Sequence, residues 1–293
     1  MSIDERYHNS PTLRWLIVGL LIAYGVILPF TLADYLINLL INTAIFALIA
    51  TAFNFAFGFA AVPSFGHAAF YALGGYSLVL LLSNSEAVPL VSDGIVVPIL
   101  LTIAIAAVAA VIMGLIALRG IGLYFALLTF GIAELFHQML LRLDFTGGSN
   151  GLILFLPDLP FGIEATPLLI YYLAYGTLVA TMGIFYWILQ SRFGRAMRAI
   201  RANDERAKFV GYPTNRIKLI TFVISAVFTT FGGIYLTLYN RVVGPSVAAA
   251  DVSLELLFVT VIVRPAYLLG PALGAVCLRV TVILTGYVGY RRR

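Results

Sequence analysis

The ionisable residues that could do chemistry in this chain are few, and they are most concentrated in one segment. Residues 191–218 hold eight of the 18 Lys and Arg residues, together with Asp204 and Glu205. Elsewhere, Glu134 and His137 stand three residues apart in an apolar run. That spacing places both side chains on one face of a helix, and a Glu-x-x-His pair of this kind ligates metal in carboxylate-bridged bundles. Such sites need a second pair and further carboxylates, so we predict no metal site.

No pattern in the sequence indicates catalysis. Ser-His-Asp, Cys-His and paired-carboxylate arrangements are absent, and the single cysteine, Cys277, excludes a disulfide framework. A phosphate-binding loop needs Gly-x-x-x-x-Gly-Lys-Ser/Thr, but the only two lysines, Lys208 and Lys218, lie in no such context. We therefore expect a chain that is not an enzyme and holds no cofactor. If ATP supplies energy, another polypeptide binds it.

The composition is that of a membrane protein. Hydrophobic residues make up 61% of the chain and charged residues 11%, whereas an average soluble domain is about 25% charged. Runs of about 20 apolar residues mark membrane-spanning helices. The predicted spans are 13–33, 35–59, 64–83, 95–118, 121–141, 168–189, 218–239 and 253–290. The last has room for two helices, or for one helix and a re-entrant piece. We predict an all-α, polytopic transmembrane helical bundle with about eight or nine membrane segments.

Basic residues set the expected orientation, because Lys and Arg accumulate on the cytoplasmic side of a membrane. With the N-terminus and Arg6 inside, the 191–218 loop is also cytoplasmic. The outside loops, 84–94 and 143–167, are acidic and nearly free of Lys and Arg. This rule explains the net charge of +5 better than nucleic-acid binding does. We expect one transmembrane domain over residues 1–293.

Polar and small residues inside the spans mark places where the backbone breaks or helices meet. Small residues crowd 58–76 and 231–235, where we expect close helix packing. Pro63 followed by Gly66 should break the backbone, which at membrane depth requires burial in protein or a cavity. A re-entrant turn facing a pathway is one interpretation, and His67 fits either a structural or a pathway role. The pathway candidates are Asn54, Ser64, His67, Thr129 and Glu134.

The basic segment is amphipathic. We expect one helix over 194–210 that ends at Gly211, before Pro213. The residues expected on its apolar side are Phe193, Met197, Ile200, Ala207 and Val210. The helix could lie on anionic membrane lipid, as polybasic segments do, or dock on a protein. The polar run at 203–205 favours a protein partner, because a purely lipid-binding face should exclude acids.

Three blocks of the chain resemble, in the same order, the permeases of the branched-chain amino acid (LivH/LivM) family of ABC importers. They are "NFAFGFAAVPSFGHAAFYALGGY" (54–76), "LTFGIAELFHQMLLRLDFTGGSNGL" (128–152) and "SRFGRAMRAIRANDERAKFVGYPTNRIKLITFVISA" (191–226). The last two resemble the LivM branch. In the third block, Glu205, Ala207 and Gly211 have the E-x-A-x-x-x-G spacing of the loop that docks on the ATPase in such importers. Arg206 replaces the usual second Ala.

The resemblance implies a permease subunit of an ATP-driven importer in a bacterial or archaeal inner membrane. It would move branched-chain or other hydrophobic amino acids, or urea-like and amide-like solutes, by alternating access. The implied partners are ATPase subunits carrying ATP and Mg, a second LivH-like permease, a soluble substrate-binding protein and membrane lipid. Residues 190–217 would form the coupling loop, and the implied coupling residues are Arg201, Asn203, Asp204, Glu205, Arg206, Ala207 and Gly211. The implied external-loop residues, near the binding protein, are Thr146, Gly147, Gly148 and Asn150.

The C-terminal region departs from the family pattern. A Gly-Gly-x-Gly turn is usual before "LLGPALGA", whereas this chain has Arg264, Pro265, Ala266 and Tyr267. Family members also continue into a further apolar helix where this chain reads "GYVGYRRR". In the orientation above, those arginines would emerge outside. We therefore expect residues 264–293 to form an atypical, shortened C-terminus.

The alternative is an autonomous secondary transporter or channel for a small polar solute. Such proteins often have inverted repeats with interrupted helices in both halves, and the regions around Pro63 and Pro265 could form such a pair. Against this, the two halves show no convincing similarity. A non-transport scaffold or membrane enzyme has no positive support. An ABC subunit copurifies with an ATPase, whereas a secondary transporter works alone.

Overall fold

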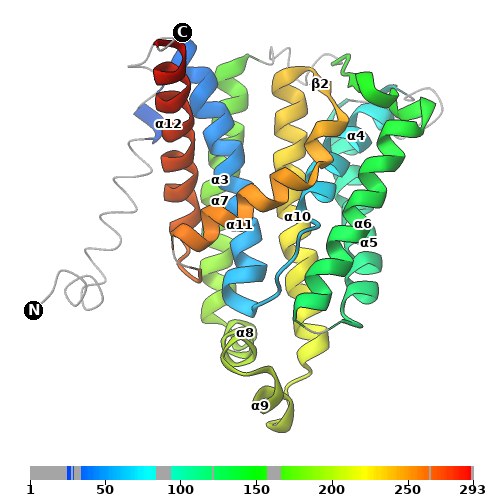
Figure 1. Cartoon of the computed structure of the whole chain (residues 1–293), viewed down its shortest axis with the longest axis vertical. Helices are drawn as coiled ribbons and strands as arrows, with labels where there is room; N and C mark the ends of the chain where they lie inside the picture. The colour runs from blue at the N-terminus through cyan, green and yellow to red at the C-terminus, as the bar shows by residue number, and fades with distance from the viewer. Residues whose placement is uncertain are drawn as a thin grey trace, which may run out of the picture.

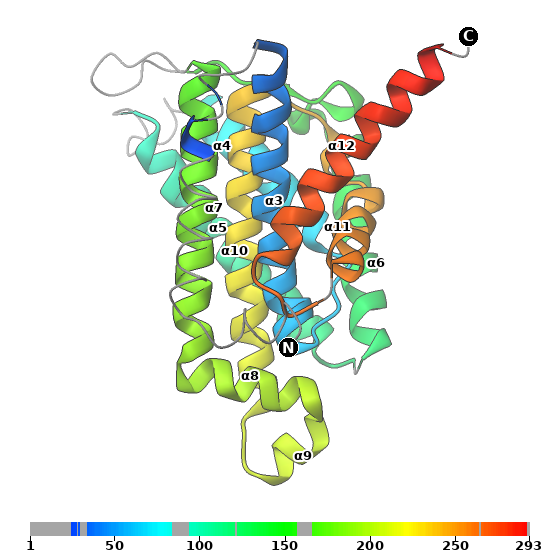
Figure 2. The ribbon, with the colours of Figure 1, turned by 90° about the vertical axis from the view of Figure 1, so that its left-hand side faces the viewer.

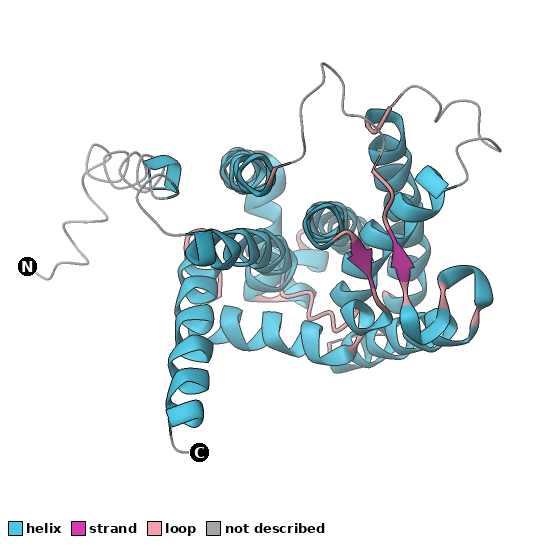
Figure 3. Ribbon diagram, turned by 90° about the horizontal axis from the view of Figure 1, so that it is seen from above, coloured by secondary structure: helices cyan, strands magenta, loops and turns pink. Residues whose placement is uncertain are grey.

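The computed structural model describes residues 25–27, 29, 34–83, 94–120, 122–156, 166–263 and 265–291. The helices of the bundle run largely along one axis, and a pair of short helices lies beyond its lower end (Figure 1). Seen from above, a pair of short strands lies over the bundle and the C-terminal helix runs along its edge (Figure 3). The first predicted span, 13–33, lies almost entirely outside the described residues.

Five helices of the described part are long and apolar enough to cross a membrane. They are α3 (Asp34–Ala60), α5 (Val96–Ala117), α6 (Leu123–Arg142), α7 (Pro167–Gln190) and α10 (Thr214–Asn240). Each coincides, within a few residues, with a span predicted from the apolar runs. The structure therefore confirms an all-α, polytopic helical bundle.

Further helices complete the bundle. Three of them are α4 (His67–Ser83), α11 (Ala250–Ile262) and α12 (Gly270–Arg291), so the predicted 253–290 interval contains two helices. With 13 residues, α11 is about 20 Å long, which is shorter than the ~30 Å hydrocarbon core. The two helices beyond the lower end are α8 (Arg192–Ala202) and α9 (Asp204–Phe209).

α3 and α10 form the centre of the molecule. α10 packs against α3, α4 and α5, and α3 also packs against α7 and α12. The most apolar windows of α3 and α10 are 67% and 56% buried, whereas those of α5 and α6 are each 28% buried. A helix that is apolar all round is either inside a core or in lipid. α5 and α6 therefore present apolar side chains outward, where a membrane would cover them.

The backbone between α3 and α4 is not helical, as the Pro63–Gly66 pattern predicts. α3 ends in a turn where Ala61 has a φ of 51° and the Val62 N–H donates to the Ala56 carbonyl at 3.1 Å. From there the chain rises into the bundle, and α4 continues toward the upper end (Figures 1 and 2). An extended segment and a 17-residue helix together make this pass, which does not turn back toward the lower end.

Glycine pairs let α4 and α10 pack in backbone contact. A Cβ on Gly233 would overlap the carbonyl oxygen of Tyr71, and a Cβ on Gly74 would overlap that of Thr230. Lipid supplies no hydrophobic force between helices, so small residues that permit close approach decide where helices associate. The close packing predicted from the small residues is confirmed.

Replacing Gly233 with Ala should therefore push α10 away from α4 and lower stability by about 1–3 kcal/mol. Gly183→Ala on α7 is the matched control, because a Cβ there meets nothing within 4 Å. Thermal unfolding of both purified variants in one detergent checks this. Equal melting temperatures for the two variants would show that the α4–α10 contact is not tight.

Candidate functional site

The start of α4 is a polar junction inside the bundle. His67 is fully buried, and its Nε2 lies 2.7 Å from Ser225 Oγ on α10. The Ser225 hydroxyl has one proton, which it donates to the Ala52 carbonyl of α3. His67 Nε2 must therefore donate to Ser225, which fixes the tautomer of a neutral imidazole. One histidine thus links α3, α4 and α10.

The backbone amides at this break are satisfied by hydroxyls of other helices. The Phe65 N–H donates to Thr129 Oγ1 of α6 at 3.1 Å, and the Ala68 N–H donates to Ser253 Oγ of α11 at 3.0 Å. Within the segment, the Gly66 N–H donates to Ser64 Oγ at 3.1 Å. The first amides of a helix have no partner of their own, and inside a membrane protein they must find one. The five hydroxyl and imidazole side chains of this junction are fully buried: Ser64, His67, Thr129, Ser225 and Ser253.

The junction contains three of the predicted pathway residues and two that sequence reasoning missed. Ser64, His67 and Thr129, from two distant segments, meet at the junction. Ser225 and Ser253 also belong to it, but they were not named as pathway candidates from the sequence. A hydroxyl in an apolar run is a weak signal, because Ser and Thr in helices often bond only their own i−4 carbonyl. Thr221 and Thr229, on either side of Ser225, do this.

Asn54 does not join the junction. Its Nδ2 donates to the Tyr267 carbonyl at 3.0 Å, and its Oδ1 accepts from the Ala266 N–H at 3.2 Å. The Asn54 side chain on α3 thus holds the turn that precedes α12. Gly58 leaves room for this side chain, because a Cβ at that position would overlap Asn54 Oδ1. Ala266 adopts a φ of 69°, a conformation that favours glycine. In this turn, where the chain has residues 264–267, the resemblance to the family predicts a Gly-Gly-x-Gly sequence. Arg264 lies outside the described residues.

Glu134 also lies apart from the junction. Its side chain is 38% exposed, accepts from Gln138 Nε2 at 2.8 Å and lies 3.7 Å from His137 Nδ1, all within α6. In the described part of the chain, no three His, Cys, Asp or Glu side chains gather as a metal would require. The structure shows Glu134 as a partly exposed residue bonded to its own helix.

The predicted external loop is a compact turn at the end of the bundle opposite α9 (Figure 1). It comprises two 3-10 turns, η2 (Asp144–Thr146) and η3 (Gly148–Asn150), followed by β1 (Leu152–Ile153). β1 pairs with β2 (Val242–Val243), which precedes a third 3-10 turn, η5 (Pro245–Ala248). Gly147 and Gly148 have φ values of 74° and 54°, as expected of a glycine turn. Thr146 is buried, with its hydroxyl against two carbonyls of the preceding turn, and Asn150 is exposed.

The basic loop folds as two helices rather than the single helix expected over 194–210. α8 packs Gly194, Ala196, Met197 and Ile200 against the bundle. Asn203 then adopts an extended backbone, with φ −164° and ψ 109°, and its side chain accepts from the Arg206 N–H at 2.9 Å. An Asn side chain competes for backbone groups and favours such a cap over a helix interior. The break turns α9 away from α8 (Figure 2).

Asp204 ties α9 to the start of α10. Its Oδ2 lies 3.0 Å from Lys208 Nζ and 2.9 Å from Lys218 Nζ. Partial burial opposes the ionised form, but the hydrogen bonds and charges of Lys218 and Lys208 outweigh it, so the pKa of Asp204 lies below its ordinary value. Of the predicted coupling residues, Asn203, Asp204 and the buried Ala207 therefore hold the loop together.

The outer face of α8 and α9 carries the remaining coupling residues. Arg201, Glu205, Arg206 and Gly211 are exposed. Phe209 is 90% and Val210 is 76% exposed, so the expectation that Val210 shares one apolar side with the buried Met197 and Ile200 is wrong. The break at Asn203 rotates the second half of the segment, which brings these apolar side chains outward. Phe209 was missed because no periodic pattern marks it.

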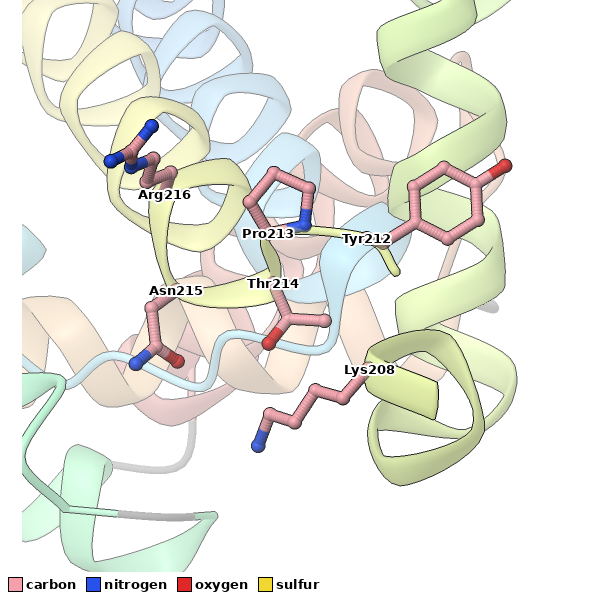
Figure 4. Close-up of a pocket in the computed structure, with 6 residues that line it drawn as sticks. All are labelled: Lys208, Tyr212, Pro213, Thr214, Asn215 and Arg216. Carbon is pink, nitrogen blue, oxygen red and sulfur yellow. The ribbon is translucent and has the colours of Figure 1, made fainter. Parts of the chain in front are cut away.

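A shallow pocket of about 340 Å³ adjoins this face. Figure 4 shows Lys208 of α9 reaching across it toward Thr214 and Asn215 at the start of α10. Its lining residues are Lys208, Tyr212, Pro213, Thr214, Asn215 and Arg216. The pocket has a basic rim.

The bundle, its interrupted pass and the basic two-helix loop at one end are those of a multi-pass helical membrane protein. Over residues 35–292 the sequence matches the family described as the branched-chain amino acid transport system / permease component. The chain belongs to this family. The resemblance found in the three sequence blocks is thus confirmed at family level.

Two relatives are each described as a "High-affinity branched-chain amino acid transport system permease protein LivM", one from Salmonella typhimurium (strain LT2) and one from Escherichia coli (strain K12). Each is 25% identical to this chain over 243 residues, covering 73% of this chain and 55% of the relative. The chain therefore spans about half the length of the curated relatives it matches. No solved structure matches it.

Ala266→Gly should stabilise the turn that Asn54 holds, by about 1 kcal/mol, because glycine adopts a positive φ without the Cβ clash. Ala272→Gly within α12 is the control and should destabilise by about 0.5–1 kcal/mol. Melting temperatures of the two variants check the prediction. A lower melting temperature for Ala266→Gly would contradict the left-handed turn.

Asp204→Asn should loosen the α9–α10 connection, because the two lysines lose their shared carboxylate. Amide hydrogen exchange over residues 203–212 should become faster. Glu205→Gln is the control, since this exposed carboxylate forms no ion pair with a described residue. In the native chain, the lowered pKa of Asp204 means that the ion pairs protect the amides fully at any pH above the ordinary pKa of 3.8. This protection against exchange is lost only as the pH falls through the lowered pKa of Asp204. Loss of protection already at pH 6 would exclude Asp204 as the cause.

Proposed function

We propose that this chain is a permease subunit of an ATP-driven importer and that α8 and α9 dock on its ATPase. The observation that carries the proposal is the exposure of five side chains of α8, α9 and the residue after it: Arg201, Glu205, Arg206, Phe209 and Val210. Together they combine a large apolar anchor with charges of both signs, which is the composition of a protein-binding surface rather than of a lipid-binding one. The basic rim of the adjoining pocket suits an acidic side chain of the partner.

The contacts of α9 supply a route for the mechanical step. A push on α9 acts on α10 through the Asp204–Lys218 ion pair. α10 carries Ser225, whose bonds reach His67 at the start of α4 and Ala52 of α3. Movement of α10 therefore shifts the junction where the interrupted pass enters the bundle. Alternating access would arise from the rearrangement of this junction.

For the cargo, the names of the two relatives favour branched-chain amino acids, and we extend the proposal to other hydrophobic amino acids. Urea-like and amide-like solutes are the less favoured cargo. The ATPase subunits, with their ATP and Mg, a second LivH-like permease and a soluble binding protein are part of the proposal. The binding protein would dock at the external loop, Thr146–Asn150. The loop of α8 and α9 would face the cytoplasm of a bacterium or archaeon, with the N-terminus on the same side.

A second candidate, an autonomous secondary transporter or channel, is favoured by one observation. Among the described residues, the helices are interrupted both at 61–66, within the junction, and at 263 and 265–269, between α11 and α12, and paired interruptions are common in secondary transporters. Copurification of an ATPase separates the two candidates, because a secondary transporter needs none.

Affinity purification of the full chain from native membranes should recover an ATPase. Glu205→Arg and, separately, Phe209→Ser should each reduce that recovery by roughly tenfold or more, since they reverse a charge and remove an apolar anchor at the interface. Asp144→Arg makes the same charge reversal at an exposed site on the opposite end and should leave recovery unchanged. If the native chain recovers no ATPase, or if all three variants behave alike, the proposal is wrong.

A further inference from the structure

The outer side of α6 carries polar residues at membrane depth. Glu134 is the twelfth of the 20 residues of this helix, so it lies about 17 Å along a length of about 30 Å. Its side chain is 38% exposed, and Gln138, one turn further along, is also exposed. Ionisable residues within a membrane span are costly, and they face the bundle interior or water, or pair with other polar groups. Glu134 lies at the outer surface instead, so its surroundings must supply what the bundle does not.

Four residues of α6 form one stripe on this outer side, which we call the α6 stripe. They are Leu127, Gly131, Glu134 and Gln138, at intervals of four, three and four residues, a spacing that keeps them on one side of a helix. Three of them are exposed and Glu134 is partly exposed. A Cβ on Gly131 would meet nothing within 4 Å. The other side of α6 packs against α4, α5 and α11, so the stripe is a free helix face.

The carboxylate in the α6 stripe is only partly satisfied by its own helix. Glu134 Oε1 accepts from Gln138 Nε2 at 2.8 Å, whereas Oε2 lies 3.7 Å from His137 Nδ1, which is too long for a hydrogen bond. Glu134 forms no further hydrogen bond with a described residue. A carboxylate can accept about four hydrogen bonds. The remaining acceptor positions therefore call for a donor from outside the described part of the chain.

The depth of the α6 stripe selects the kind of partner. A soluble ATPase or binding protein meets a permease at the ends of its bundle, whereas Glu134 stands near the middle of a span. The first predicted span of this chain ends elsewhere, because the carbonyls of Gly25 and Val26 accept from Tyr171 and Tyr172 of α7 at 2.8 Å and 3.0 Å. α6 and α7 lie on opposite sides of the bundle (Figures 1 and 2). The partner is therefore a membrane-spanning helix of another chain.

A second copy of this chain does not complement the α6 stripe. Identical chains associate most often about a two-fold axis, and the same patch then faces itself. The Glu134 side chains of both copies would approach each other, and like charges placed opposite one another are unfavourable. A different chain that brings a hydrogen-bond donor to this depth matches the carboxylate. The side chain of such a donor is a hydroxyl, an amide or a basic group.

We propose that the α6 stripe packs against a membrane-spanning helix of the second, LivH-like permease, and that this helix donates a hydrogen bond to Glu134. The inference rests on the proposed importer and deepens it by naming the surface that joins its two permeases. Gly131 lets the two backbones approach closely, as small residues do between helices in lipid. Glu134 and Gln138 fix the register of the pair, because a polar group held between two helices must meet its partner.

The first test fills the space at Gly131. Gly131→Leu should lower recovery of the second permease with the full chain from native membranes by roughly tenfold or more, because the added side chain keeps the helices apart. Leucine favours a helix more than glycine does, so the melting temperature of the isolated chain should not fall. Gly183→Leu on α7 is the matched control, since a Cβ there also meets nothing within 4 Å. It should leave recovery unchanged.

The second test separates a protein-covered face from a lipid-covered one. Glu134→Leu should lower recovery of the second permease by roughly threefold to tenfold, the worth of a hydrogen bond between helices. Glu134→Gln keeps an acceptor and should retain part of that recovery. If lipid covers the stripe, Glu134→Leu removes a costly group and leaves recovery unchanged. That result, or recovery that Gly131→Leu leaves unchanged, overturns the proposal.

A photoreactive amino acid at Leu127 identifies what lies against the stripe. We expect crosslinked peptides from a membrane span of the second permease. The same probe at Trp187, which is 76% exposed on α7, should give none of these peptides. Crosslinks from Leu127 only to lipid, to a second copy of this chain or to its own residues 1–24 overturn the proposal.

ATPase recovery, measured in parallel, distinguishes failure of this surface from failure of the importer. If the native chain recovers an ATPase but no second permease, or if every variant recovers both, the α6 stripe is refuted and the importer stands. If the native chain recovers neither protein, both proposals are wrong.

Discussion

The structure depends on one constraint: backbone amides inside a membrane protein must find hydrogen-bond partners, because lipid offers none. The start of α4 breaks the regular pattern that would satisfy them locally. Its amides are instead bonded by Thr129 of α6 and Ser253 of α11, while His67 reaches Ser225 of α10. A break in one helix therefore fixes the positions of three others.

The same constraint governs the turn before α12. There the backbone of Ala266 and Tyr267 is bonded by the amide of Asn54 on α3. Both irregular segments are thus held by polar side chains of a central helix or its neighbours, and both stand next to α11. The short helix lies between two places where the backbone is not helical. These are the elements of the bundle that can shift without breaking a long helix.

The loop of α8 and α9 is stabilised by different interactions because it lies outside the bundle. α8 is held by burial of Met197 and Ile200, whereas α9 is held by a cap at Asn203 and by the ion pairs of Asp204. A small unit held by few contacts can respond to a partner. Its link to α10 connects it to the junction at His67, and from there to Ser253 and α11.

The sequence by itself determined the class of fold, the positions of the five long spans and the family, because long apolar runs and ordered motifs are local signals. It also located the break at Pro63–Gly66 and the glycine turn at Gly147–Gly148, since proline and glycine act on their own backbone. Only the tertiary structure decided which polar residues meet. Ser225 and Ser253 were not singled out in the sequence, and Asn54, a pathway candidate, bonds the turn before α12 instead. The helix packing that gives each its partner depends on contacts far apart along the chain, which no local pattern records.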